Sequence, residues 1–496
     1  MDRRVFLQNV AGTVVAASLP SAGIAADPAR PDKKMIGIQV GAVSFADEGV
    51  SKVLDECQRS ASVNTLFVAT FTYGRGIAGR QIPGQPLPDH GSQKYDTDTF
   101  FGGSYTKVNP KYYTNTAFKD FRAPDLGSFD VLEQVIPEAK KRGMRTICWY
   151  EDVFRRGLPN IEKLQEVELS GKKAETLCFN NPDYLSWLQD IAEDWSRSYD
   201  IDGIMWGSER QGALSNVLGA SHADPQPSEA TCFCEFCYAK ARRQGVNPER
   251  ARQGFLELEK FVLANRKGIR PVDGRYVEFW RLMLRYPEML AWESLWTSSL
   301  REAQKAIYDR VKAISPKLGV GWHIWHNNSF NPIYRAEQDL AEMAPYSDFL
   351  KIVMYHNCAG ERMADYINSV GTSYFSDIPK QELLEFHYRV MDYGKEPQLM
   401  DLPTTGFSAN YVYRETKRAK EALKDSKTEL WPGIDIDIPT ERGNSKCTPA
   451  GTKAAVLAAF RGGADGVILS RKYSEMKLEN LRAAGAALKD MGLAKK

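Results

Sequence analysis

The sequence predicts an α/β fold, a (β/α)8 TIM barrel with long loops on its active face. Eight apolar, β-rich runs recur along the chain, and helix-periodic segments lie between several of them. Continuous apolar strands that alternate with helices are typical of a parallel sheet covered on both faces, and eight such units form a closed barrel. A doubly wound open sheet is the alternative, because periodicity alone does not show closure. No Gly-rich phosphate turn such as GxGxxG follows any of the runs, which favours the barrel.

The eight predicted strands are the apolar runs 35–45, 63–73, 144–151, 201–209, 318–326, 349–356, 429–438 and 464–473. The helix-periodic segments between and after them are 50–61, 130–142, 182–199, 295–314, 415–425, 452–462 and 478–491. We expect residues 35–496 to form one barrel domain.

Two connections are too long for simple loops between a strand and a helix. Residues 74–129 mix Gly, Pro, Tyr and Asp irregularly, and residues 210–294 hold a cysteine cluster and further helices. The loops that follow barrel strands lie on the active face. We therefore expect both insertions to form walls of a substrate cleft; the alternative is packing against the side of the barrel.

The N-terminus has the pattern of an export signal. Residues 1–26 carry the basic pair Arg3-Arg4, then an uncharged apolar run, then small residues that suit cleavage. The arginine pair resembles a twin-arginine signal, although Asp2 and Gln8 depart from the usual flanking residues. A plain secretory signal or an N-terminal helix is the alternative. With 27–34 as a linker, the mature protein is expected in the periplasm or outside the cell, with no membrane association after signal removal.

The charge balance argues for a small polar ligand. Lys plus Arg number 65 against 63 for Asp plus Glu, so no global field favours nucleic acid or an anionic surface. The composition of 43% apolar and 26% charged residues is that of a globular protein with a large core.

Acidic residues end two of the predicted strands. If the strand within the fourth run spans 201–206, Glu209 stands just past its end, and the seventh run delivers Asp435, Asp437 and, after a turn, Glu441. Cleavage of a glycosidic bond needs two carboxyl groups, one to protonate the leaving group and one to attack the anomeric carbon or activate water. We predict Glu209 and Asp437 as this pair. Asp435 shares a face with Asp437, and each acid could instead cap a helix or pair with an arginine.

Other strand ends carry groups suited to sugar hydroxyls and ring faces. The remaining predicted substrate-binding residues are Glu151, Asp152, Trp206, Arg210, His323, His326, Asn327, Tyr355, His356 and Arg471. The tryptophans of the strands are on average expected in the core, with one or two at the rim able to stack on a pyranose ring.

Three motifs carry a family resemblance. "CFNNPDY" (178–184), "DGIMWGSERQG" (202–212) and "CFCEFC" (232–237) look like those of secreted, hypothetical glycosyl-hydrolase-like proteins of bacteria. The strand order, with acids ending strands four and seven, resembles the clan A glycoside hydrolases. That resemblance implies Glu209 as general acid/base, a nucleophile on strand seven and a retaining mechanism. The residue before the acid is Ser208 rather than the usual Asn, a departure at the expected sugar contact.

The cysteine cluster suits a metal or a disulfide. Cys232, Cys234 and Cys237 place three thiols within six residues, a spacing that fits tetrahedral zinc. The candidates for a fourth ligand are Cys178, Cys358, Cys447 and His222, and some related galactosidase-like barrels carry a cysteine zinc site near the corresponding loop. In an oxidising compartment, a disulfide plus a free thiol is the alternative. Either would be structural.

The sequence therefore predicts an exported glycoside hydrolase that acts on an oligo- or polysaccharide and needs no cofactor for catalysis. One alternative is a carbohydrate-binding barrel without hydrolysis. The other is a metal-dependent lyase, isomerase or hydrolase with His323, His326, His356 and Glu151 as ligands.

Overall fold

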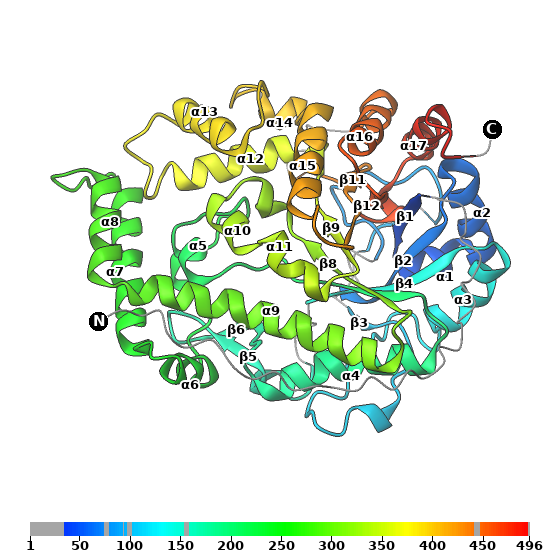
Figure 1. Cartoon of the computed structure of the whole chain (residues 1–496), viewed down its shortest axis with the longest axis horizontal. Coiled ribbons are helices and arrows are strands. Elements are labelled where there is room, and N and C mark those ends of the chain that lie inside the picture. Colours follow the sequence, from blue (N-terminus) through cyan, green and yellow to red (C-terminus); the bar gives the residue numbers. More distant parts are fainter. Residues whose placement is uncertain are drawn as a thin grey trace, which may run out of the picture. The chain divides into compact units, whose positions relative to one another are not determined.

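The computed structural model describes residues 34–73, 79–92, 94–96, 102–152, 158–440 and 447–494. From Lys34 onward the chain forms one compact unit (Figure 1). The predicted export signal and all of the predicted linker except Lys34 lie outside the described residues. None of the helices in the described ranges is both long and apolar enough to cross a lipid bilayer.

The predicted (β/α)8 barrel is confirmed. Its parallel strands neighbour one another in chain order, and they are β1 (Met35–Val40), β2 (Thr65–Tyr73), β4 (Arg145–Glu151), β7 (Gly203–Gly207), β8 (Gly319–Ile324), β9 (Phe349–Ile352), β10 (Glu429–Leu430), β11 (Gly433–Asp435) and β12 (Gly466–Ser470). The short strand β3 (Gly102–Ser104) pairs antiparallel with β2, off this path.

Strands β10 and β11 together fill the seventh barrel position. They are two pieces of one predicted strand, separated by Trp431 and Pro432, and a proline interrupts a ladder because it has no N–H to donate. β10 pairs with β9, and β11 pairs with β12. A further parallel bridge joins Val353, just beyond β9, to Gly433. These pairings close the ring.

The lower interior of the barrel is a compact apolar layer. Its members occupy alternate strand positions and are Met35, Phe67, Ala69, Ile147, Trp149, Met205, Phe349, Trp431 and Ile468. The rings of Phe349 and Trp431 stack with centroids 4.0 Å apart. Inward glycines make room for these rings: a Cβ on Gly37 would lie 2.6 Å from Phe67, and one on Gly321 would lie 2.4 Å from Phe349. Large and small inward residues are thus matched across the interior.

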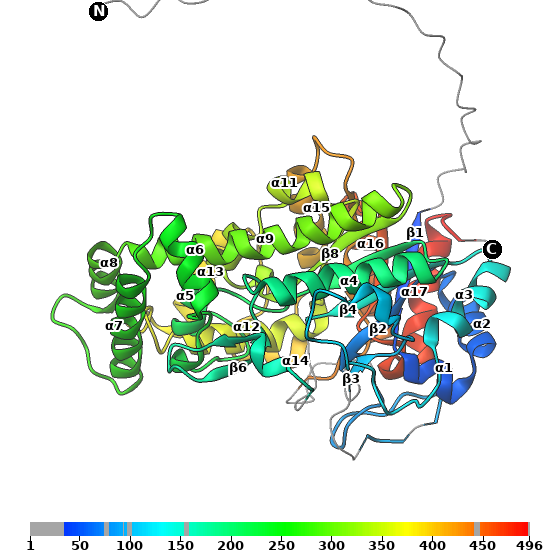
Figure 2. The ribbon, with the colours of Figure 1, turned by 90° about the horizontal axis from the view of Figure 1, so that it is seen from below.

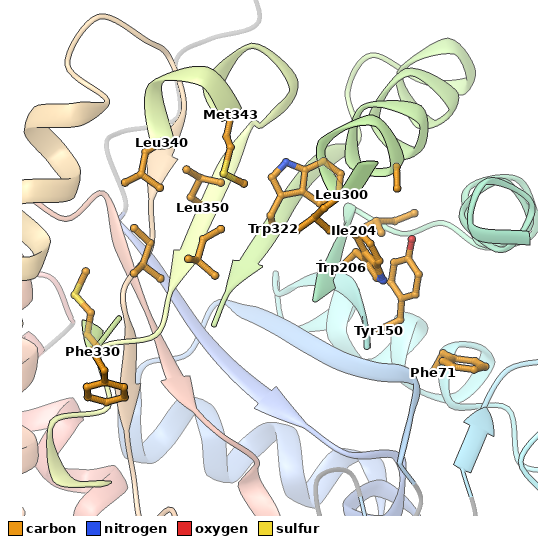
Figure 3. Packing of buried hydrophobic residues seen from close by; sticks show 14 of the residues in the cluster. Phe71, Tyr150, Ile204, Trp206, Leu300, Trp322, Phe330, Leu340, Met343 and Leu350 are labelled. Carbon is orange, nitrogen blue, oxygen red and sulfur yellow. The ribbon is translucent and has the colours of Figure 1, made fainter. Parts of the chain in front are cut away.

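A second, larger apolar layer lies between the strands and the helices. Figure 3 shows Tyr150, Ile204, Trp206, Trp322 and Leu350 within it, packed with residues of the covering helices. Because side chains alternate along a strand, residues next to inward positions point outward. Trp206, predicted to bind substrate, belongs to this outer layer and is 1% exposed.

All seven predicted helices are present: α2 (Val50–Ala61), α3 (Val131–Lys141), α4 (Pro182–Ser198), α9 (Glu288–Ile314), α15 (Ala409–Ala422), α16 (Pro449–Arg461) and α17 (Leu478–Asp490). Five have nearly the predicted bounds, whereas α9 and α15 begin seven and six residues earlier than predicted. Local signals fix several starts. Asp130 accepts hydrogen bonds from the amides of Leu132 and Glu133, and Asn181 accepts one from the amide of Asp183. Helices α4 and α9 lie side by side against the sheet (Figures 1 and 2).

Several apolar runs stop being strands before the predicted end. The first run leaves the sheet after Val40, and its last residues begin helix α1 (Ala42–Glu48). The fifth and sixth runs end in helical turns, a 3-10 helix at His326–Ser329 and helix α12 (His356–Val370). Apolar character continues into the start of α1, and the polar first turns of the other two helices are equally buried. Burial therefore continues past each strand and does not mark where the strand ends.

The sequence also missed elements inside the connections. They are the hairpin of β5 (Gln165–Val167) and β6 (Lys173–Leu177), and the helices α5 (Ala213–Val217), α6 (Glu235–Arg243), α7 (Pro248–Arg266), α8 (Arg275–Arg285), α10 (Pro332–Glu337), α11 (Leu340–Met343), α13 (Lys380–Met391) and α14 (Leu402–Thr405). Of the two long connections, only Arg210 contributes to the described lining of the polar cavity considered next.

Candidate active site

A polar cavity of about 160 Å³ opens at the carboxyl ends of the barrel strands. Active sites of TIM-barrel enzymes lie at this end of the barrel. Its described lining comes from most of the strands and is Gln39, Trp149, Glu151, Asp152, Thr176, Glu209, Arg210, His323, Tyr355, Arg362 and Arg471. The barrel therefore gathers acidic, basic and aromatic side chains from distant parts of the sequence in one place.

The period of the strands explains this polar layer. Glu151 follows the inward residue Trp149 by two positions, and Lys351 follows Phe349 in the same way. Gln39 and His323 likewise lie two residues beyond the inward glycines Gly37 and Gly321. These four strands thus present either an apolar side chain or a glycine at the lower level, and a polar side chain at the level of the cavity.

A chain of hydrogen bonds orients Glu209. The Nζ of Lys351 donates to Nδ1 of His323 at 3.1 Å, and Nε2 of His323 lies 3.1 Å from Oε1 of Glu209. Lys351 also donates to Oε1 of Gln39 at 2.7 Å and to the Tyr355 hydroxyl at 2.9 Å. A neutral His323 that accepts at Nδ1 must carry its proton at Nε2, where it donates to Glu209.

The charges of the site keep Glu209 ionised. Enclosure alone would raise the pKa of Glu209, but the hydrogen bond to His323 and the positive charges nearby, including Arg362 and Lys351, lower it to about 2. Burial lowers the pKa of His323 to about 4 and that of Lys351 to about 7. The Glu209 side chain is 43% exposed, so its carboxylate is reachable from the cavity.

Glu151 is protonated at neutral pH, whereas Glu209 is ionised. Burial, with the negative charge of Glu209 as the next cause, raises the pKa of Glu151 to about 8. Its Oε1 accepts a hydrogen bond of 2.5 Å from the indole N–H of Trp149. A Cβ on Gly207, the partner of Glu151 across the β4–β7 pair, would lie 2.5 Å from Oε2, so the glycine makes room for this carboxyl. At neutral pH the cavity therefore holds one protonated and one ionised glutamate.

Asp152 and Arg210 form an ion pair beside Glu151 and Glu209. Arg210 forms ion pairs with Asp152 and, at 2.9 Å, with Glu166 on β5. Asp152 also accepts hydrogen bonds from the Tyr184 hydroxyl and, at 3.0 Å, from the Ser208 hydroxyl. Ser208, the departure from the family pattern, thus hydrogen-bonds to an acid of the cavity wall.

Of the other predicted substrate-binding residues, Tyr355 and Arg471 line the cavity, and three lie outside its described lining. His326 is buried, and its Nε2 lies 3.2 Å from the Tyr411 hydroxyl. Asn327 is buried and donates to the carbonyl of Ala220 at 3.1 Å. His356 begins helix α12 and is 6% exposed.

The structure does not bring Asp437 into this cavity. Strand β11 ends at Asp435, and Asp437 has a left-handed backbone, with φ of 57°. Its carboxylate accepts hydrogen bonds from the Lys477 amide at 2.7 Å and from the Asn480 side chain at 2.8 Å, next to the start of α17. The expectation that Glu209 and Asp437 share one hollow is therefore not met in the described lining.

The other acids of the seventh strand lie elsewhere too. Asp435 is fully buried, and its Oδ2 accepts a hydrogen bond of 2.9 Å from the amide of Cys358 near the start of α12. Glu441 lies outside the described residues.

Sequence reasoning missed four residues of the site: Gln39, Thr176, Lys351 and Arg362. A signal was present for two of them. Gln39 in "IGIQV" and Lys351 in "FLKIV" are polar residues inside apolar strands, a pattern that indicates an inward polar position. Thr176 and Arg362 come from a hairpin and a helix that the sequence did not predict.

The cysteine cluster has a fourth member, Cys178. The sulfur atoms of Cys178, Cys232, Cys234 and Cys237 all lie within 4.8 Å of one another, with Cys178 at 3.5 Å from Cys234 and 3.6 Å from Cys237. Zinc bound by four thiolates at about 2.3 Å holds its sulfurs about 3.8 Å apart, so the donor set fits this ion. The amide of Val167 and the side chain of Asn180 point N–H groups at two of the sulfurs, as expected around thiolates.

No other metal-binding group is present among the described residues. The four cysteines are the one set of three or more His, Cys, Asp or Glu residues whose ligand atoms lie close together there. The alternative that used His323, His326, His356 and Glu151 as ligands therefore finds no support in the described part of the chain.

Comparisons with known proteins give the fold. No family model and no curated protein matches the chain by sequence. Among solved structures, a β-galactosidase from the haloarchaeon Halorubrum lacusprofundi matches with a TM-score of 0.50 at 12% identity, covering 92% of this chain and 58% of that one. The glycoside hydrolase domain of PgaB from Bordetella bronchiseptica matches with a TM-score of 0.48 at 12% identity, covering 93% and 99%.

An α-L-fucosidase from Paenibacillus thiaminolyticus also matches, with a TM-score of 0.47 at 12% identity, covering 93% of this chain and 49% of that one. The chain thus spans about half the length of the fucosidase and 58% of the galactosidase. At 12% identity the likeness to the galactosidase shows a shared fold alone.

Proposed function

We propose that the protein hydrolyses glycosidic bonds of a carbohydrate, with Glu151 as general acid and Glu209 as nucleophile. One observation carries the proposal: two carboxyl groups from adjacent strand ends line the same cavity, and their pKa values lie on opposite sides of neutrality. Glycoside hydrolysis needs one protonated and one ionised carboxyl group, and environments that push two pKa values apart mark such pairs.

Each residue of the network then has a role. Protonated Glu151 delivers a proton to the leaving oxygen while ionised Glu209 attacks the anomeric carbon and forms a glycosyl-enzyme. The Glu151 carboxylate then takes a proton from the water that displaces Glu209, so the configuration is retained and both groups return to their starting states. Lys351 and His323 hold Glu209 in place and ionised. The proposal replaces Asp437 with Glu151 and reverses the role first expected for Glu209.

The test is a pair of variants with two classes of aryl glycoside. In Glu151→Gln, kcat/KM for substrates with poor leaving groups falls about 10²- to 10⁴-fold, whereas kcat/KM for dinitrophenyl glycosides, whose departure needs no proton, is almost normal. Azide added to this variant yields a glycosyl azide of retained configuration. Glu209→Gln is inactive on both classes. Asp437→Asn is the matched control and keeps its activity.

Two results would overturn this assignment. If Asp437→Asn is inactive while Glu151→Gln behaves as wild type, the pair first expected from sequence is correct. If wild-type protein binds oligosaccharides but cleaves no activated glycoside, the chain is a carbohydrate-binding barrel.

We further propose that the four cysteines bind a structural zinc ion. The mutual sulfur distances and the N–H groups directed at the thiols support this, and a disulfide is the alternative. The cluster lies beside β5 and β6, whose Glu166 and Leu177 contact Arg210. Purified protein should contain about one zinc per chain and lose thermal stability on chelation. Metal-free protein with two fewer reactive thiols than expected would favour the disulfide.

We also propose export to the periplasm or the exterior, on the basis of the sequence of residues 1–26. A fusion of these residues to a reporter, compared with an Arg3→Lys, Arg4→Lys double variant, tests it. Export that the double variant does not reduce would contradict the twin-arginine route.

A further inference from the structure

One guanidinium of the cavity has no acidic partner among the described residues. Arg362, on helix α12, lines the cavity, and its Nη1 lies 2.9 Å from Nδ1 of His326. The other two arginines there are neutralised: Arg210 by Asp152 and Glu166, and Arg471 by Glu475. No ion pair of 4.0 Å or less joins Arg362 to a carboxylate in the described part of the chain.

Two histidines near Arg362 do not compensate its charge. Burial, and next the charge of Arg362, lower the pKa values of His222 and His326, that of His222 to about 3. Both histidines are therefore neutral at physiological pH and do not compensate the guanidinium. The charge of Arg362 also lowers the pKa of Glu209, but the described hydrogen bond of Glu209 goes to His323.

Arg471 adds donors to the same end of the cavity. It uses Nε and Nη2 for Glu475, at 3.2 Å and 2.9 Å, so Nη1 has no protein partner among the described residues. Burial raises the pKa of Cys358, while the positive charges of Arg362 and Arg471 both lower it. Both arginines thus lie near this thiol, which is on the first turn of α12.

We propose that the substrate carries a carboxylate which Arg362 binds with help from Nη1 of Arg471, so that the sugar in this cavity is a uronic acid. The proposal rests on the proposed function, since it names the substrate class of that site. A guanidinium recognises a carboxylate through two parallel N–H···O bonds. A carboxylate at C5 replaces a hydroxymethyl group without added bulk, whereas a sulfate ester would enlarge the ring substituent in a cavity of about 160 Å³.

A second role for Arg362 must be distinguished from this one. The same charge lowers the pKa of Glu209, after burial and the interactions of His323. If that were its whole role, loss of Arg362 would slow cleavage of neutral and acidic glycosides alike. Anion recognition predicts instead a selective loss for acidic ligands.

Binding without turnover gives the first test. Calorimetry or saturation-transfer NMR compares D-glucuronate and D-galacturonate with D-glucose and D-galactose. Wild type should prefer a uronate, Arg362→Gln should lose about 10- to 100-fold of uronate affinity, and Arg362→Lys should lose less. Neutral-sugar binding should stay unchanged. Arg310→Gln, which removes a surface arginine paired with Glu193, is the control. Equal affinity for uronates and neutral sugars in wild type would overturn the proposal.

Kinetics gives the second test and separates the two proposals. Nitrophenyl glucuronides, galacturonides, the neutral glycosides and a sulfated glycoside are compared by kcat/KM. Preference for a uronide that Arg362→Gln abolishes supports the inference. Preference for the sulfated glycoside, or an equal fall on all substrates, overturns it. If no glycoside is cleaved but uronate binding depends on Arg362, the hydrolase proposal fails and the anion site stands.

Discussion

Two pairs of glutamates in this protein have similar chemistry and opposite surroundings. Glu151 and Glu209 line the polar cavity at the strand ends, among a histidine, a lysine and arginines. Glu293 on α9 and Glu337 on α10 line an apolar groove of about 740 Å³ beside the barrel. In each pair, burial raises the pKa of one member: Glu151 to about 8, and Glu337 well above its usual value.

The second members differ. Nearby His323, Arg362 and Lys351 outweigh burial and lower the pKa of Glu209 to about 2. Glu293 has no such cations among the causes of its shift: burial raises its pKa, and hydrogen bonds from Glu337 and from backbone amides only partly oppose this. Its Oε2 accepts from the amide of Leu214 at 2.8 Å, which anchors α5. Cationic neighbours, rather than the closeness of two acids, therefore distinguish the candidate catalytic pair from the structural one.

Removing one carboxylate from each pair tests most directly whether only the cavity pair acts in catalysis. Glu209→Gln should lower kcat/KM on an activated glycoside by about 10⁴-fold or more, because no other ionised acid in the described cavity is placed to replace it. Glu337→Gln should change it less than about twofold, since Glu337 is already neutral. Similar losses in the two variants would show that the groove pair acts in catalysis or that both changes act through folding, which circular dichroism decides.

The pH dependence sharpens the contrast. Glu151 must be protonated to act as an acid, so kcat/KM on a substrate with a poor leaving group should fall about tenfold per unit above pH 8. Glu151→Gln assayed with a dinitrophenyl glycoside should lack this limb. A limb that persists in the variant would assign the titration to another group.

Removing Lys351, the cation that is hydrogen-bonded to His323, should lower activity less than removing Glu209 does. Lys351→Met breaks the hydrogen bond to His323, so we expect kcat to fall about 10- to 100-fold and the acidic limb of the profile to move to higher pH as the pKa of Glu209 rises. Lys420→Met, which removes a surface lysine paired with Asp465, is the control. An unmoved acidic limb would contradict the electrostatic role of Lys351.

The smallest effect concerns stability. The pKa of Glu337 is higher in the folded protein than in the unfolded chain. Between these two pKa values the folded state binds more protons than the unfolded state. The free energy of unfolding therefore falls as the pH rises through that range. Glu337→Gln removes the titration, so the variant should gain stability relative to wild type as the pH rises from 4.5 to 7. Urea unfolding at pH 4.5 and pH 7 measures it; equal stability of the two proteins at both pH values would argue against a protonated Glu337.

Much of the fold was predictable because a parallel barrel leaves a strong pattern. Its strands are buried on both faces and read as apolar runs, and caps such as Asp130 mark helix starts. The elements within the long connections were missed, since their sequences mix helical and irregular signals. Glu209, Glu151 and His323 were found because a strand end delivers its side chains to the barrel rim.

The rest of the site depended on details that a sequence does not display. The left-handed backbone at Asp437 turns its carboxylate to α17, and nothing in "IDIDIPTE" indicates that conformation. Arg362 reaches the cavity from a helix whose start replaces the predicted end of a strand. Cys178 was one of four candidates, and only the fold brings it to the other three cysteines.

The inward glycines limit how such a protein could be re-engineered. A single methyl at Gly207 would meet the carboxyl of Glu151 at 2.5 Å, and one at Gly433 would meet the Lys351 side chain at 2.9 Å. A substitution at either glycine must displace Glu151 or Lys351, the side chains to which the proposed mechanism gives roles, so variants at these positions should lose activity more than stability. Thr176 on β6 lines the same cavity and is a better position at which to seek new substrate preferences. Varying it changes the cavity lining without a direct change next to Glu151 or Lys351.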